Sequence, residues 1–211
     1  MGYGADSAAA KRLLALSEFG QVRTYKKGTI MIAEGDHGAS LFILQTGAVR
    51  AYSDNSIGRE ITFGVYGPGD YVGEMSLDGG SRSASIIAIE QTRCSVVSRD
   101  TVVKFVSECP EFAFDLLARV IRRGRLATQS ARNLALMDSY SRLVLALSEL
   151  ATPGNGSDKG VIPRVTHREL ANQIGTSREM VSRLLKDLEK GGYISTEGRR
   201  ISIQRKLPAG W

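Results

Sequence analysis

The sequence predicts an α+β protein in which a β-rich segment, one long helix and a helix-turn-helix with a β-hairpin follow one another. Three observations support this fold class. Short apolar runs alternate with glycine-containing turns from Arg23 to about Ser98, as in an all-β sandwich or barrel. After Pro110, apolar and small residues recur with a 4-3 spacing, which is typical of a long helix with a seam. Residues 166–190 contain two short amphipathic segments joined by a turn with glycine, the pattern of a helix-turn-helix.

Composition restricts the class of protein. The chain has 211 residues, of which 42% are hydrophobic and 24% charged, and these values are typical of a globular protein with one large or two small domains. No apolar run approaches the roughly 18–20 residues that span a bilayer, and no signal pattern opens the chain, so we expect a cytoplasmic protein with no membrane contact. Cys94 and Cys109 form no disulfide framework, and with two separated histidines they predict no metal, haem or iron–sulfur cluster.

The basic charge is concentrated at the C-terminal end. The formal net charge of the chain is +6. Residues 164–211 contain ten Lys or Arg and five Asp or Glu, a net charge of +5, so the preceding 163 residues are nearly neutral. This asymmetry indicates that the C-terminal module meets a polyanion. The alternative is a basic face that is merely solvated.

A short amphipathic helix is predicted over residues 7–18, before the β-rich segment. The strand-like runs that follow it are TIMIA, SLFILQ, AVRAY, EITFGVY, SIIAIE and CSVVS. Positive φ is often needed at the turns between strands, and glycines occur there at Gly28, Gly35, Gly47, Gly58 and Gly69.

The long helix is predicted over about 110–137, and its seam consists of Ala113, Leu117, Val120, Gly124, Ala127, Ala131 and Leu134. The small residues in this row allow a second helix to approach closely but bury little area. The seam therefore predicts a homodimer whose pairing depends on something added there. The alternative is a core helix that packs against the chain's own barrel.

A second domain is predicted to begin near Asp138, whose side chain suits an N-cap for the helix SYSRLVLALSELA. The predicted domains are therefore 1–137, which includes the long helix, and 138–211. The polar, turn-rich run TPGNGSDKG, residues 152–160, is expected to be a surface loop.

Capping residues define the helix-turn-helix. Thr166 and Glu169 have the spacing of a capping box, Gly175 ends the first helix, and Ser177 caps the second. The run YISTEGRRISI then predicts a β-hairpin that turns at its Glu-Gly dipeptide. The module is therefore a winged helix-turn-helix.

The exposed start of the second helix carries side chains suited to reading base pairs. Arg178, Glu179, Ser182 and Arg183 fall on one helical face. Arginine can donate two parallel hydrogen bonds to guanine, and glutamate can accept one from the amino group of cytosine. A carboxylate facing phosphates would be repelled, so Glu179 favours reading in the major groove over binding by charge alone. The residues placed to hold the DNA backbone are Thr166, Ser177, Lys186, Arg199 and Arg200.

The stretch GEMSLDGGSRSA, residues 73–84, places Glu74 near two glycines, Arg82 and Ser83. By itself it is compatible with a solvated loop or with a cradle for a small anion. A buried guanidinium and the backbone N–H groups of a short turn would neutralise a cyclic phosphate. A carboxylate nearby would repel that phosphate unless it met a hydroxyl group.

Taken together, these motifs resemble the CRP/FNR family of bacterial transcription regulators, and specifically its cyclic-AMP receptor protein branch. The segments that carry the resemblance are YKKGTIMIAEGDHGASLFILQTGAVRAY, GDYVGEMSLDGGSRSA, RNLALMDSYSRL and THRELANQIGTSREMVSRLLKDLE. The resemblance implies a β-roll of the cyclic-nucleotide-binding, jelly-roll type, a long dimerisation helix and a winged helix-turn-helix that binds double-stranded DNA. It also implies a homodimer that meets RNA polymerase, with the loop 152–160 as a contact by family position.

For the sensor, the resemblance implies cyclic AMP as the effector. Glu74 matches the residue that accepts the ribose 2′-hydroxyl, and Arg82 and the following serine match those that hold the cyclic phosphate. Arg123 and Thr128 match positions on the purine side, with Thr128 reaching the ligand of the partner subunit. Ala127 departs from the family, in which a hydroxyl residue is usual there, and Glu74 and Arg82 are closer in sequence than usual. The implied ligand-binding residues are Gly73, Glu74, Met75, Ser76, Arg82, Ser83, Ala84, Arg123, Ala127 and Thr128.

For the DNA-binding module, the resemblance implies that Arg178, Glu179 and Arg183 read a TGTGA-like half-site. Met180 stands where relatives often carry a hydroxyl residue. The implied DNA-binding residues are Thr166, His167, Arg168, Ser177, Arg178, Glu179, Met180, Ser182, Arg183, Lys186, Arg199 and Arg200.

Two alternatives remain open beside a cyclic-AMP-controlled regulator. The first keeps the DNA-binding regulator but changes the effector to cyclic di-GMP, another metabolite or none, and Ala127 motivates it. The second is a nucleotide-sensing protein that acts through protein partners, and the basic helix-turn-helix argues against it. An enzyme is not expected, because the sequence offers no nucleophile–base pair and no metal site.

Overall fold

The computed structural model describes residues 7–153, 160–162 and 164–208. The described chain divides into two compact units. The first contains the residues up to Ser53 and the segment Thr62–Arg125. The second contains Asp54–Ile61 and the residues from Leu126 onward.

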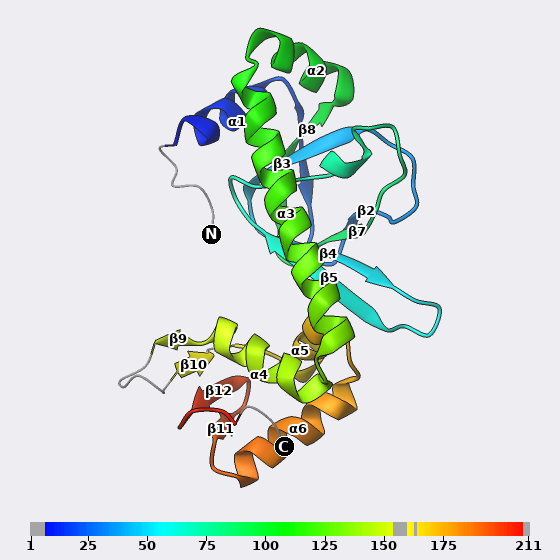
Figure 1. Cartoon of the computed structure of the whole chain (residues 1–211). Helices are drawn as coiled ribbons and strands as arrows, with labels where there is room; N and C mark the ends of the chain where they lie inside the picture. Colours follow the sequence, from blue (N-terminus) through cyan, green and yellow to red (C-terminus); the bar gives the residue numbers. More distant parts are fainter. Residues whose placement is uncertain (1–6, 154–159, 163, 209–211) are drawn as a thin grey trace. The chain divides into compact units, whose positions relative to one another are not determined.

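Three elements pass from one unit into the other, namely β4 (Val49–Asp54), β5 (Glu60–Tyr66) and the long helix α3 (Glu111–Leu136) (Figure 1). The other elements of the first unit are α1 (Ala8–Glu18), β1 (Gln21–Tyr25), β2 (Ile30–Ile32), β3 (Ser40–Thr46), β6 (Tyr71–Val72), the short 3-10 helix η1 (Glu74–Ser76), β7 (Ser85–Ala88), β8 (Thr92–Ser98) and α2 (Arg99–Glu108). The β-roll has two four-stranded sheets, with strand orders β1-β8-β3-β6 and β2-β7-β4-β5.

Strand β3 is buried on both faces because successive side chains of a strand point in opposite directions. Leu41 and Ile43 pack in a cluster with residues of α1, β8, α2 and α3. Phe42 and Leu44 pack in a second cluster with residues of β2, β4, β6 and β7. Each fully buried aliphatic side chain of this kind contributes about 1.5–3 kcal/mol to folding. The stretch from β6 to β7, which includes residues 73–84, therefore has both of its ends anchored in these two buried clusters.

The predicted turns are confirmed, since the five glycines named above have φ between 74° and 87°. One helix was not predicted from the sequence. Helix α2 begins directly after β8, where the side chain of Ser98 caps it by accepting from the backbone N–H of Thr101 at 3.2 Å. Only Val102 of this helix is fully buried, but Phe105 and Val106 pack against the same cluster, and the spacing of these three residues was the available helical signal.

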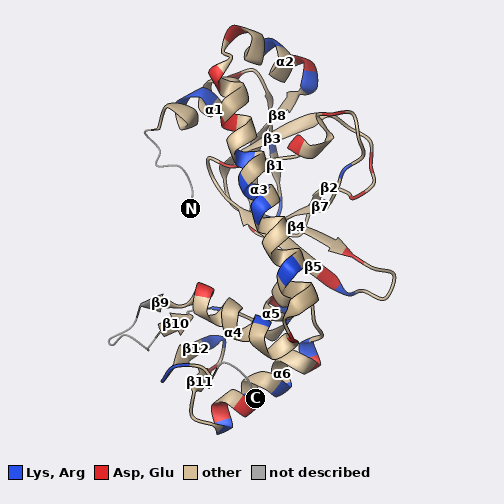
Figure 2. Cartoon of the chain, viewed as in Figure 1, with Lys and Arg blue, Asp and Glu red and all other residues tan. Residues whose placement is uncertain are grey.

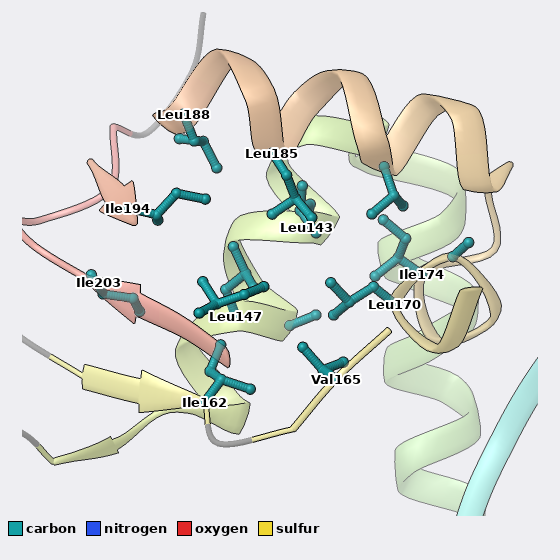
Figure 3. Packing of buried hydrophobic residues seen from close by; sticks show 14 of the residues in the cluster. Leu143, Leu147, Ile162, Val165, Leu170, Ile174, Leu185, Leu188, Ile194 and Ile203 are labelled. Carbon is teal, nitrogen blue, oxygen red and sulfur yellow. The ribbon is translucent and has the colours of Figure 1, made fainter. Parts of the chain in front are cut away.

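The second unit contains α4 (Ser139–Leu150), β9 (Thr152–Pro153), β10 (Gly160–Ile162), α5 (His167–Ile174), α6 (Arg178–Lys190), β11 (Ile194–Glu197) and β12 (Arg200–Ile203). Its strands form one sheet of order β11-β12-β10-β9. Figure 3 shows side chains of α4, α5, α6 and the sheet that meet in a single core, among them Leu147, Leu170, Leu185 and Ile203. The predicted α+β class, with an N-terminal β-roll, a long helix and a C-terminal winged helix-turn-helix, is confirmed.

The predicted caps of this unit are present. Asp138 caps α4 by accepting from the backbone N–H of Ser141 at 2.7 Å, and Thr166 and Glu169 form the capping box of α5. Gly175 ends α5 with a φ of 65°.

The predicted surface loop 152–160 differs from the structure at its ends. Thr152 and Pro153 form β9, and Gly160 begins β10, with which β9 pairs. Residues 154–159 of that loop lie outside the described part of the chain, and so does the polymerase contact expected from them.

Candidate functional site

The site in the first unit is built around the turn that follows β6. Gly73 has a φ of 91°, a conformation that only glycine adopts without strain. A Cβ atom there would lie 2.7 Å from both Arg82 Nη1 and Ser40 O. The hydroxyl of Ser76 donates to Gly38 O at 2.7 Å and closes the turn against the loop before β3. Glycine at position 73 therefore lets the guanidinium of Arg82 approach the backbone.

The guanidinium of Arg82 is held on one side only. Arg82 is 8% exposed, and its Nη1 donates to Gly73 O at 2.8 Å and to Ser40 O at 3.1 Å. Its Nη2 and Nε lie toward Gly38, where an added Cβ would come within 3.4 Å of Nη2. Within the described residues these two nitrogens donate no hydrogen bond.

Burial lowers the pKa of Arg82, and the charges of Glu74 and Asp36 raise it by less. A buried cation with two unused donors is costly unless an anion meets it. The structure therefore supplies the cationic half of an anion site at Arg82.

Glu74 and Arg123 form an ion pair beside this turn. Arg123 Nη1 and Glu74 Oε1 are 2.5 Å apart, and the carboxylate side chain is 6% exposed. Arg123 also donates to Tyr71 O at 2.6 Å, and its guanidinium lies over the rings of Tyr66 and Tyr71 at 4.4 and 5.3 Å. Burial acts to lower the pKa of Arg123, but the charge and hydrogen bond of Glu74 outweigh it and raise that pKa. Two residues predicted to meet different parts of a ligand thus meet each other.

The other predicted ligand residues are more exposed. Ser83 is exposed and donates to the sulfur of Met75 at 3.2 Å, and Met75 is 61% exposed. Ala84 is half-buried. Ala127 and Thr128 are exposed on the part of α3 that belongs to the second unit, so the first unit unites only the residues from Gly73 to Ala84 with Arg123.

Sequence reasoning did not find the aromatic and cationic residues around this pair. Tyr71 is buried, and burial raises its pKa. Arg119 is 7% exposed, donates to Asp70 Oδ1 at 3.0 Å, and lies over the ring of Tyr71 at 5.0 Å. The four-residue spacing of Arg119 and Arg123, which puts both on one face of a helix, was the available signal.

The second site lies at the start of α6. The side chain of Ser177 caps the helix by accepting from the backbone N–H of Met180 at 3.1 Å. Arg178, Glu179 and Arg183 are exposed, as a set of base-reading side chains must be. Figure 2 shows Lys and Arg along α6, and Lys186 is among the exposed ones.

Two pairs of residues that were predicted to bind DNA contact each other. His167 Nδ1 and Ser182 Oγ are 2.7 Å apart. Arg183 Nη2 lies 2.9 Å from the sulfur of Met180, so Met180 holds an arginine instead of offering a hydroxyl.

A cavity of about 420 Å³ unites the start of α5, the start of α6 and the wing. Its lining consists of Val165, Thr166, His167, Arg168, Arg178, Gly198 and Arg199. Helix N-termini and arginines both attract anions. The cavity therefore combines five of the twelve residues predicted to bind DNA. The other seven lie outside its lining, namely Ser177, Glu179, Met180, Ser182, Arg183, Lys186 and Arg200.

Two further observations limit the chemistry. No group of three or more His, Cys, Asp or Glu side chains that could hold a metal ion occurs among the described residues. None of the described helices is long and apolar enough to cross a membrane.

The fold and the two sites define a class, a cyclic-nucleotide-binding β-roll joined to a winged helix-turn-helix. The model of the cyclic nucleotide-binding domain matches residues 22–109, and that of the Crp-like helix-turn-helix domain matches residues 141–206. The chain belongs to the CRP/FNR family of bacterial ligand-responsive transcription regulators.

Similar proteins support this assignment over most of the chain. The chain is 37% identical to the cyclic AMP receptor protein of Thermus thermophilus, over 86% of this chain and 82% of that protein. It is 32% identical to a CRP-like cAMP-activated global transcriptional regulator of Mycobacterium tuberculosis, over 90% of this chain and 87% of that protein. The solved structure of the c-di-GMP responsive global regulator CLP of Xanthomonas campestris matches with a TM-score of 0.80 and 25% identity, over 94% of this chain and 99% of CLP.

Proposed function

We propose that the chain is a dimeric, sequence-specific DNA-binding regulator controlled by cyclic AMP. The observation that carries the proposal is the guanidinium of Arg82, buried beside Glu74 with two donors unused. A cyclic phosphate carries one negative charge and can accept from both donors. Its ribose hydroxyl is the kind of group that a nearby carboxylate can accept from, so Arg82 and Glu74 are proposed to hold the phosphate and the ribose.

The remaining predicted ligand residues keep their proposed roles. Gly73, Met75 and Ser76 form the turn, Ser83 is proposed to hold the cyclic phosphate together with Arg82, and Ala84 is proposed to lie beside them. Arg123, Ala127 and Thr128 are proposed to line the purine side, with Thr128 serving the partner subunit's ligand. The proposed functional division remains 1–137 for the sensor and 138–211 for DNA binding.

Exposed apolar side chains along α3 support a homodimer. In the seam, Leu117 is 53% exposed, Val120 44% and Leu134 40%. A Cβ at Gly124 would meet no atom within 4 Å, so the space beside it can take a second helix. These exposures disfavour a helix whose seam packs against its own barrel. Replacing Gly124 with Leu should weaken dimerisation in analytical ultracentrifugation, and an unchanged dimer would contradict the seam.

For DNA, we propose that Arg178, Glu179 and Arg183 read a TGTGA-like half-site in the major groove. The two half-sites of a dimer would lie about 34 Å apart, on DNA that is bent where its sequence allows. Thr166, Arg168, Ser177, Lys186, Arg199 and Arg200 are proposed to hold phosphates. RNA polymerase is a proposed partner, and the cytoplasm the proposed location, because the family regulates transcription.

A second candidate keeps the regulator but changes the effector to cyclic di-GMP. It is favoured by Ala127, which lacks a hydroxyl, and by the likeness to a regulator described as c-di-GMP responsive. Isothermal titration calorimetry with cyclic AMP, cyclic GMP and cyclic di-GMP separates the two. Binding of cyclic di-GMP alone would remove cyclic AMP control.

The test of the whole proposal is fluorescence anisotropy of a labelled TGTGA palindrome with and without cyclic AMP. We expect tighter binding with the nucleotide, because a ligand that prefers the binding-competent state shifts the population toward it. Equal affinity in both conditions would refute cyclic AMP control. Absence of any sequence-specific binding would instead favour action through protein partners.

A further inference from the structure

The segment Asp54–Ile61, which belongs to the second unit, contacts helix α5 through one carboxylate. Asn172 Nδ2 donates to Glu60 Oε2 at 2.6 Å, and Arg168 Nη2 lies 3.6 Å from Glu60 Oε1. The side chain of Glu60 is 17% exposed. Each carboxylate oxygen therefore faces a different donor of the same helix.

The two donors are neighbours on one face of α5 because they are four positions apart. They differ in exposure. The side chain of Arg168 is 69% exposed, whereas Asn172 is half-buried. Asn172 thus anchors Glu60 by a short hydrogen bond to a charged group, and Arg168 is held by a looser ion pair.

Arg168 also lines the cavity that it shares with Arg178 and Arg199 at the proposed DNA-binding face. A phosphate and a carboxylate compete for the same guanidinium, and arginine can pair with two oxygens of either group. Glu60 offers Arg168 only Oε1, because Oε2 accepts from Asn172, whereas a phosphate can offer two oxygens. The carboxylate of Glu60 adds a negative charge where a DNA backbone needs a positive one. Its presence lowers the attraction of this face for a polyanion.

We propose that Glu60 is an intramolecular competitor of the DNA backbone. In the DNA-free chain it holds Arg168 and Asn172, and tight DNA binding requires Arg168 to exchange the carboxylate for a phosphate. The proposal rests on the proposed function, since it concerns the strength of the same DNA contact.

Strand β5 connects Glu60 to the proposed effector site, so the contact of Glu60 with Arg168 can depend on the effector. Glu60 is the first residue of β5 and Tyr66 is the last, and the ring of Tyr66 lies under the guanidinium of Arg123. The same strand therefore carries the proposed competitor as its first residue and a side chain of the effector site as its last. An effector that moves Arg123 would act on Tyr66 and, through β5, on Glu60.

The test compares the DNA affinities of Glu60→Gln and Asn172→Ala with that of the full wild-type chain, by anisotropy with a TGTGA palindrome. Glu60→Gln removes the competing charge, and Asn172→Ala removes its anchor without changing charge. We expect both variants to bind DNA about threefold to tenfold more tightly without effector, since an exposed ion pair is weak but a hydrogen bond to a charged group is stronger. The ratio of affinities with and without cyclic AMP should fall correspondingly.

Two controls separate this effect from a general change in charge. Glu90→Gln removes the same charge from an exposed residue of the first unit and should leave affinity unchanged. Adding Arg168→Gln should cancel the gain of Glu60→Gln. The proposal that Glu60 competes with DNA would be wrong if the DNA affinity were unchanged in both Glu60→Gln and Asn172→Ala. It would also be wrong if Glu90→Gln gained as much DNA affinity as Glu60→Gln.

Failure of the proposed function has a different signature, because the wild-type chain would then bind no duplex with or without effector. In that case, hydrogen exchange tests whether Glu60 contacts helix α5. Amides of residues 54–61 should exchange faster in both variants than in the wild-type chain, and equal exchange would overturn the contact itself.

Discussion

The replacement Arg82→Gln tests the anion site directly. The guanidinium uses Nη1 for Gly73 O and Ser40 O, and offers Nη2 and Nε to a ligand. Glutamine removes the charge and both donors. A hydrogen bond between charged partners contributes about 1.5–3 kcal/mol, so loss of two should weaken cyclic AMP binding by roughly 3–6 kcal/mol, or about two to four orders of magnitude.

The stability of the chain should change much less. The two carbonyl oxygens lose their donor, which costs about 1–3 kcal/mol, but removal of a buried charge offsets part of that cost. Isothermal titration calorimetry measures the affinity, and thermal unfolding without nucleotide checks the fold. Arg93→Gln, at an exposed residue of β8, is the control. A folded Arg82→Gln protein that binds cyclic AMP within threefold of the wild-type affinity would refute the assignment.

Four further outcomes are expected. Gly73→Ala should destabilise the fold by about 1–3 kcal/mol, measured by chemical unfolding, because its φ is 91°; no loss would mean that the turn relaxes. Replacement of Arg178 or Arg183 by Ala should cost about 1–3 kcal/mol of DNA affinity for each lost base contact, and in each case only for duplexes carrying the matching base. A backbone hydrogen bond lowers the pKa of Asp138, so its cap stabilises the fold above the unfolded-state pKa and is lost as pH falls through the folded-state value; the stability gap between wild type and Asp138→Ala should close below that pH. Burial raises the pKa of Cys94 to about 11, so at pH 8 a thiol reagent should leave Cys94 unmodified in the folded chain and label it on unfolding.

The parts that were predictable from the sequence are those with a local signal. The capping box of Thr166 and Glu169 depends on only four consecutive residues, and the structure contains it as predicted. The glycines of the turns were equally readable because positive φ is a local property. Helix α2 was missed although Val102, Phe105 and Val106 have the spacing of a helical apolar face and pack in one cluster.

The site could be predicted only in part. The residues between Gly73 and Arg82 are close in sequence, so their proximity was expected. The pairing of Glu74 with Arg123, and the stacking of Arg123 on Tyr66, join residues up to 57 positions apart. Such contacts depend on how α3 lies against the β-roll within the first unit, which no local pattern encodes. Arg168 was assigned a DNA contact from sequence, but its ion pair with Glu60 joins residues that only the fold brings together.

The ion pair of Glu74 and Arg123 has a consequence for the concentration at which the sensor responds. In the proposed complex, a ribose hydroxyl that donates to Glu74 must share or displace the guanidinium of Arg123, so opening the ion pair offsets part of the gross binding free energy. The apparent dissociation constant is the intrinsic one divided by the fraction of chains that are competent to bind. Substitutions that strengthen or weaken the hold on Arg123, for example at Tyr66, can therefore shift the response threshold without altering any atom that touches the nucleotide.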